Sequence, residues 1–92
     1  MDAVLPIPAR LTHDLATPAL LALTGTLARE TGTKVVADAG ALEEFDSSAL
    51  AVLLACRRQA LAAGKAFSVQ DLPDRLRRLS RLYGVETLLP AA

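Results

Sequence analysis

The sequence predicts a single α/β domain with a small, mainly parallel β-sheet and helices packed against it. Its 92 residues suit one domain, which we assign to residues 1–92. Short apolar stretches typical of strands alternate along the chain with longer segments of helical periodicity. Because connections of helix length separate the strands, we expect right-handed β-α-β units whose neighbouring strands run parallel.

The composition predicts an aliphatic core. Hydrophobic residues make up 52% of the chain, whereas aromatic residues make up only 3%. A domain of this size buries roughly 60–65% of the surface that its unfolded chain exposes, so a high aliphatic content is required. A deep pocket lined by aromatic side chains is not expected.

The first third of the chain predicts a strand followed by a helix. Residues 3–7 form the strand, whose prolines suit a sheet edge, and residues 9–12 continue it after a kink. Thr17 and Pro18 predict the helix start, because threonine caps free N–H groups and proline suits the first helical position. We expect this helix to end near Gly32. Its apolar face comprises Leu20, Leu23 and Leu27, with Leu21 beside them.

One residue inside this first helix is unusual. Gly25 costs up to about 1 kcal/mol relative to alanine in a helix interior. We expect it to allow close packing of the helix against the sheet.

The middle of the chain predicts a buried strand and the longest helix. Residues 34–37 form a continuous apolar run, which is typical of a buried parallel strand. Residues 38–45 are expected to form a loop, and residues 46–63 a helix that Gly64 ends. The apolar stripe of this helix comprises Leu50, Leu53, Leu54 and Leu61.

The last third of the chain predicts another strand at residues 66–70, followed by a helix. This helix is expected to start within residues 71–74 and to end at Gly84. Residues 85–89 form a short terminal strand or turn. One face of the helix carries Leu76, Leu79 and Tyr83, and another carries Arg75, Arg78 and Arg81. The arginines are either a solvated face or a patch for an acidic partner or anionic lipid head groups.

Charge and hydropathy exclude several classes of function. The net charge is zero, so nucleic-acid binding is not expected, since that affinity comes mainly from neutralising phosphates. We expect no signal peptide in residues 1–10 and no segment long enough to cross a bilayer. Cys56 is the single cysteine, and its place among leucines predicts buried packing rather than nucleophilic chemistry.

No set of residues in the sequence combines a nucleophile, a base and an oxyanion site, so we expect no catalytic residues and no cofactor. His13 has no partner at metal-ligand spacing and is expected at the surface. The acids Asp38, Glu43, Glu44 and Asp46 are best explained as a solvated loop, so no metal site is expected.

The junction Asp46-Ser47-Ser48 has two interpretations. Asp46 or Ser47 can cap the following helix, and an acidic side chain also suits the positive end of the helix dipole. Alternatively, Ser47 or Ser48 is an exposed hydroxyl at a recognition surface. The residues alone favour capping and leave the second interpretation open.

Val35-Val36-Ala37-Asp38 and Phe45-Asp46-Ser47-Ser48-Ala49-Leu50 together resemble the signature of the STAS domain, named for sulfate transporters and anti-sigma factor antagonists. Two later segments, Arg57-Arg58-Gln59-Ala60 and Leu82-Tyr83-Gly84-Val85, are similar to the small STAS subunits of Mla phospholipid ABC transport systems. The resemblance extends over residues 11–90. It implies a STAS-like fold and a function in protein binding without catalysis.

By resemblance to the Mla subunits, the chain is a regulatory or stabilising subunit that binds the ATPase of a phospholipid ABC transporter, with the permease in the same complex. The protein would be cytoplasmic and attached to the inner membrane only through the transporter. The implied contact residues are Asp46, Ser47, Ser48, Leu50, Ala51, Leu54, Arg57 and Arg58.

By resemblance to anti-sigma factor antagonists, Ser47 would instead be phosphorylated by a serine kinase anti-sigma factor, which would block partner binding. The sequence departs from that pattern because Ala49 stands where glycine is common, and because the first strands are short and contain proline.

Overall fold

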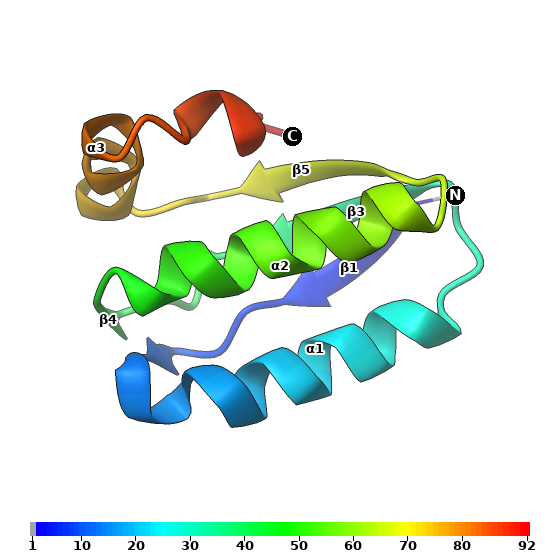
Figure 1. Cartoon of the computed structure of the whole chain (residues 1–92), viewed down its shortest axis with the longest axis horizontal. Coiled ribbons are helices and arrows are strands. Elements are labelled where there is room, and N and C mark those ends of the chain that lie inside the picture. The colour runs from blue at the N-terminus through cyan, green and yellow to red at the C-terminus, as the bar shows by residue number, and fades with distance from the viewer. Residues whose placement is uncertain (1) are drawn as a thin grey trace.

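The structure is a computed structural model that describes residues 2–92. Its strands are β1 (Asp2–Pro6), β2 (Arg10–Leu11), β3 (Lys34–Asp38), β4 (Glu44–Phe45) and β5 (Ala66–Gln70). Its helices are α1 (Ala16–Arg29), α2 (Ser48–Ala62) and α3 (Asp74–Leu82), with short 3-10 helices η1 (His13–Leu15) and η2 (Glu86–Leu88). The predicted α/β fold class is confirmed (Figure 1).

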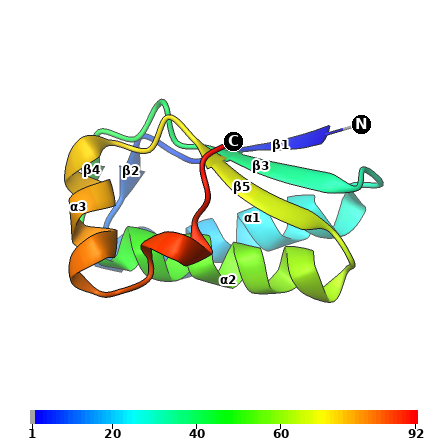
Figure 2. The same cartoon turned by 90° about the horizontal axis from the view of Figure 1, so that it is seen from above.

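The main sheet has the strand order β1-β3-β5, and both strand pairs are parallel. The two connections advance across the sheet in the same direction. If both β-α-β connections have the same handedness, their helices must lie on the same face of the sheet. Figure 2 shows α1 and α2 on the same face. The two helices run side by side in the same direction (Figure 1).

The central strand β3 is buried as predicted. Val35, Val36 and Ala37 are 1%, 9% and 0% exposed. The edge position expected from the prolines of the first strand is also confirmed, because β1 pairs only with β3 among the described strands. Most of the remaining core comes from α1, α2 and the inward-facing residues of the outer strands.

A second, two-stranded sheet was not predicted. β2 pairs in parallel with β4, matching Arg10 with Glu44 and Leu11 with Phe45. The expectation of an uninterrupted loop over residues 38–45 is therefore wrong. The partners are more than 30 residues apart in the chain, and two-residue strands leave no periodic pattern in the sequence.

The predicted start of α1 is wrong. The helix begins at Ala16, directly after η1, so Thr17 lies inside the first turn and does not cap it. It also ends at Arg29, before Gly32, because Glu30 adopts an extended conformation.

The predicted packing of α1 is partly confirmed. Leu23 and Leu27 are buried, but Leu21 is 69% exposed. A Cβ atom added at Gly25 would have only the Arg29 guanidinium nearby, at 3.9 Å, so the expected close packing of this glycine against the sheet is wrong.

The apolar stripes predicted for the other two helices are also partly confirmed. Leu53 and Leu76 are fully buried, whereas Leu61 is 46% exposed and Tyr83 is 58% exposed. Leu61 lies in the last turn of α2, where its neighbour Ala60 takes the buried position, and Tyr83 follows the last residue of α3.

The C-terminal segment closes the edge of β5. The predicted strand or turn is a 3-10 helix, η2, followed by a single parallel bridge between Val69 and Ala91. Leu89, between the two, is fully buried. None of the helices described in residues 2–92 has both the length and the apolar character needed to cross a bilayer.

Candidate functional site

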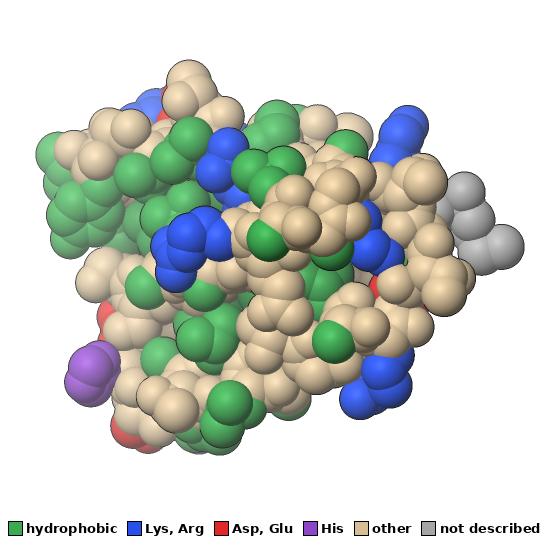
Figure 3. Space-filling view, turned by 45° about the vertical axis from the view of Figure 1, so that its right-hand side comes forward, with side chains coloured by type: hydrophobic (Ala, Val, Ile, Leu, Met, Phe, Trp, Pro, Cys, Tyr) green, Lys and Arg blue, Asp and Glu red, His purple; other side chains and the backbone are tan. Residues whose placement is uncertain are grey.

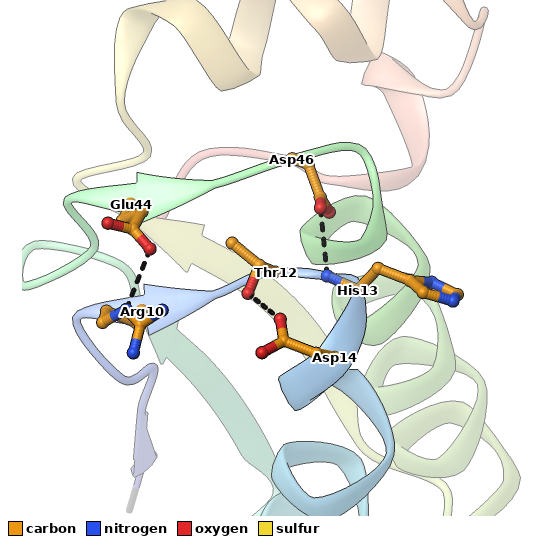
Figure 4. Close-up of polar contacts among 6 residues, drawn as sticks. All are labelled: Arg10, Thr12, His13, Asp14, Glu44 and Asp46. Carbon is orange, nitrogen blue, oxygen red and sulfur yellow. Dashed lines mark hydrogen bonds and ion pairs between the residues drawn. The ribbon is translucent and has the colours of Figure 1, made fainter.

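Asp46 connects the N-terminal ends of two helices. One carboxylate oxygen, Oδ1, accepts a hydrogen bond from the backbone N–H of Ser48 at 2.8 Å. The other, Oδ2, accepts one from the backbone N–H of His13 at 3.0 Å (Figure 4). The carboxylate therefore caps the first turn of α2 and also fixes η1, which leads into α1. The capping role predicted for this junction belongs to Asp46 and not to Ser47.

The same contacts explain the ionisation of Asp46. The backbone N–H of Ser48, followed by that of His13, holds the pKa of the carboxyl below its ordinary value of 3.8. The pKa of nearby Asp14 is also lowered, chiefly because the Thr12 hydroxyl donates a hydrogen bond to it. Both groups are fully exposed and carry negative charge at neutral pH.

The two serines of the junction differ in their surroundings. Ser47 is exposed at the N-cap of α2, and its side chain makes no capping hydrogen bond. Ser48 is half-buried, and its Oγ lies 3.5 Å from Nδ1 of His13. Ser47 is therefore the more accessible of the two hydroxyl groups.

A groove of about 250 Å³ runs between α1 and α2, beginning beside this junction. It is lined by Ala16, Thr17, Leu20, Ala51, Val52, Ala55 and Arg58. Hydrophobic side chains emerge on the helix-covered side of the molecule, with Lys and Arg side chains among them (Figure 3). The groove is smaller than the roughly 300–1,000 Å³ of ordinary ligand pockets, so it fits side chains of a partner better than a cofactor.

The predicted contact residues lie in different surroundings. Ala51 and Arg58 line the groove, and Leu54 and Arg57 are half-buried on α2. Leu50 is only 3% exposed and belongs to the core, so its predicted place on a contact surface is wrong.

Sequence reasoning missed the contribution of α1 to this surface. Ala16, Thr17 and Leu20 line the groove from that helix. The available signal was the pair Ala51 and Ala55, four residues apart on α2, because small residues at one helix face leave space beside it.

Three of the four acids of the predicted acidic loop make separate local contacts. Asp38 accepts a hydrogen bond from the backbone N–H of Gly40 at 2.9 Å, and Glu44 forms an ion pair with Arg10 at 2.9 Å (Figure 4). Asp46 caps α2, and Glu43 is exposed. Within residues 2–92 no three side chains of the metal-ligating types are grouped to hold an ion.

Cys56 lies on the buried face of α2, as predicted. Burial raises the pKa of its thiol to about 11, so the thiol stays protonated at neutral pH. Because the thiolate is the reactive form, the geometry is consistent with packing and not with nucleophilic chemistry.

The arginines of α3 do not form one uniform patch. The Arg75 guanidinium lies 4.5 Å from the ring centroid of Phe45, a cation–π contact. Arg81 and Arg77 both approach Glu86, at 2.6 Å and 3.9 Å. Arg77 and Arg81 therefore share one carboxylate within the chain.

Taken together, these features define a parallel α/β domain whose site is suited to binding another macromolecule. The site consists of an exposed serine at the N-terminal end of α2 and an adjoining groove lined largely by apolar side chains.

The chain matches the family described as "Mlab, STAS domain" over residues 2–90. Because the match covers nearly the whole chain, the protein belongs to the STAS domain family, and membership indicates a regulatory or protein-interaction role. A search of curated proteins found no match to the sequence.

Proposed function

We propose that this STAS domain is a non-catalytic regulatory subunit that binds the ATPase of a phospholipid ABC transporter. The observation that carries the proposal is the surface formed by exposed Ser47 and the groove between α1 and α2. The description of the matched family and the resemblance of residues 57–60 and 82–85 to Mla subunits favour this partner. The permease would belong to the same complex, attached through the ATPase.

The STAS subunit would regulate the ATPase by binding its conformational states with different affinities. A subunit without chemistry of its own changes the behaviour of an ATPase only if it binds one conformational state more tightly than another. The rigid connection of the α1 and α2 N-termini through Asp46 suits this role, because it presents both helices as one fixed surface.

Ser47→Glu should weaken binding to the ATPase by at least about tenfold, equivalent to ~1.4 kcal/mol. The substitution adds a negative charge beside the ionised carboxylate of Asp46. Isothermal titration calorimetry with the purified ATPase measures the effect. Ser47→Ala serves as the uncharged control, and Thr87→Glu places the same charge on η2, away from the groove.

An unchanged dissociation constant for Ser47→Glu would remove the junction from the interface. Equal weakening by Thr87→Glu would show that net charge, and not the position of the charge, determines the affinity.

A second candidate is an anti-sigma factor antagonist switched by phosphorylation of Ser47. The exposed Ser47 hydroxyl, which makes no capping bond, favours it. A phosphate there would lie near the N–H groups of α2 but beside Asp46, so attraction and repulsion would compete.

Affinity purification of the tagged chain from its native membrane fraction, followed by mass spectrometry, separates the two candidates. Recovery of an ABC ATPase with its permease supports the transporter subunit. Recovery of a serine kinase, with phosphate on Ser47, supports the antagonist and contradicts the first proposal.

A further inference from the structure

The groove between α1 and α2 exists because its walls are made of small residues. Ala16 on α1 and Ala51 and Ala55 on α2 face the space that larger side chains would fill. Leu20 and Val52 supply apolar surface from the two helices. The hollow is therefore a recess for an aliphatic side chain from outside the domain.

The groove has two different ends. At one end, the Gln59 side chain donates a hydrogen bond to the carbonyl of Thr24 at 3.2 Å and so ties α1 to α2. Arg58 precedes Gln59 and lines this end. At the other end lies the junction with Asp46, whose carboxylate is ionised. The groove is thus positive at one end and negative at the other.

Arg58 is exposed and forms no ion pair with any side chain described in residues 2–92. Arg10, Arg77 and Arg81 have carboxylate partners within the chain. Arg78 is exposed and unpaired among the described side chains, as Arg58 is, but only Arg58 of the two lines the groove. A guanidinium at the rim of an apolar recess is a recognition element for a carboxylate, with which it forms paired hydrogen bonds.

Resting on the proposed function, we propose that the groove binds a helical segment of the ATPase that carries an aliphatic side chain and a carboxylate one turn apart. The aliphatic side chain enters the recess, and the carboxylate pairs with Arg58. Ala55 and Arg58 are three residues apart, about 4.5 Å along the axis of α2. A residue pair at positions i and i+3 or i+4 of a partner helix matches this distance.

The charges also fix the direction of the partner. A carboxylate placed at the junction end would meet Asp46 and Asp14, both ionised at neutral pH, and would be repelled. A helix is the favoured shape because the groove between two packed helices accepts the side-chain ridge of a third.

Two substitutions test the recess and the charge separately. Ala55→Leu fills the groove with an aliphatic side chain, and Arg58→Glu reverses the charge at its rim. Each should weaken binding to the purified ATPase at least about tenfold in calorimetry. Ala62→Leu and Arg78→Glu make the same chemical changes at exposed positions outside the groove, on α2 and α3, and should bind as wild type does.

A charge swap gives the sharpest result. Acidic residues of the ATPase are changed to arginine one at a time, and one of them should restore binding to Arg58→Glu while weakening binding to wild type. Circular dichroism of each variant confirms that it is folded.

The outcomes separate this inference from the proposed function. Wild-type affinity in both Ala55→Leu and Arg58→Glu would overturn the groove as the contact and leave the ATPase as the partner. Failure of the wild-type chain to bind the ATPase would overturn both. Binding lost in Ala55→Leu and Arg58→Glu, retained in their controls and rescued by one partner acid would establish the contact.

Discussion

At the scale of single residues, Asp46 is the side chain that links the two helix ends at the site. A typical N-cap carboxylate satisfies one helix end, whereas this carboxylate accepts backbone hydrogen bonds at 2.8 Å and 3.0 Å from two separate segments. Its charge also faces the positive end of the α2 dipole. Asp46 therefore shapes the surface on which Ser47 is presented.

Replacing Asp46 with asparagine should remove a pH-dependent part of the stability. Because the pKa of Asp46 in the folded chain lies below its ordinary value of 3.8, the ionised carboxylate stabilises the fold above about pH 4. That contribution is lost as the pH falls through the folded pKa. We expect the difference in melting temperature between wild type and Asp46→Asn to shrink as the pH is lowered from 7 to 2.5.

Thermal unfolding followed by circular dichroism measures this difference. Asp14, whose pKa is also lowered, titrates in both proteins, but the charge of Asp46 raises its pKa slightly and is absent from Asp46→Asn. The comparison is therefore made with Asp14→Asn in both proteins. A difference that stays constant with pH would show that the charge of Asp46 does not stabilise the fold.

At the scale of elements, the helix ends are set by glycine and by tertiary contacts. Gly64 follows α2 with φ of +76°, and Gly84 follows α3 with φ of +72°. This left-handed conformation is strained for residues with a Cβ atom, so glycine at these positions ends the helix. The start of α1, by contrast, follows η1, whose first residue His13 donates a hydrogen bond to Asp46 in another part of the chain.

Two glycine substitutions should have opposite effects. Gly64→Ala should destabilise the fold by about 1–2 kcal/mol, because alanine is strained at positive φ although no atom lies within 4 Å of the added Cβ. Gly25→Ala should stabilise it by up to about 1 kcal/mol, because a helix interior favours alanine and the nearest atom is 3.9 Å away. Urea denaturation measures both, and effects of the same sign would refute this account.

At the scale of the whole molecule, the last residues complete the core. Pro90 accepts a hydrogen bond from Val69 at 2.8 Å, and Ala92 donates one to Val69 at 2.9 Å, so the end of the chain covers the edge of β5. Leu89 enters the core beside them. Covering a strand edge in this way removes a site for unwanted strand pairing.

Leu89→Ala should therefore destabilise the whole domain by about 2–5 kcal/mol, as expected for a large-to-small change in a core. This is a large share of the roughly 5–14 kcal/mol expected for a domain of 92 residues. Leu82→Ala is the control, because Leu82 is 78% exposed and should change stability by less than about 0.5 kcal/mol. Similar midpoints for the two variants in urea would show that the C-terminal segment is not part of the cooperative core.

Much of the fold could be predicted because its signals are local. The apolar run of β3, the bounds of β5 and the ends of α2 and α3 at Gly64 and Gly84 all follow from neighbouring residues. The Asp-Ser-Ser junction was recognisable for the same reason, since capping chemistry acts within one helical turn.

The order of the main strands and the helices, the aliphatic core and the position of the serine junction can all be deduced from the sequence, because periodicity and capping depend on residues close together in the chain. Three features depend on packing between distant segments: the pairing of β2 with β4, the second contact of Asp46 and the groove that Ala16 and Ala55 share. These features join segments more than 30 residues apart. Such contacts form only when the chain is packed, so a local pattern such as Ala51 and Ala55 can indicate space beside a helix but cannot identify the segment that lies there.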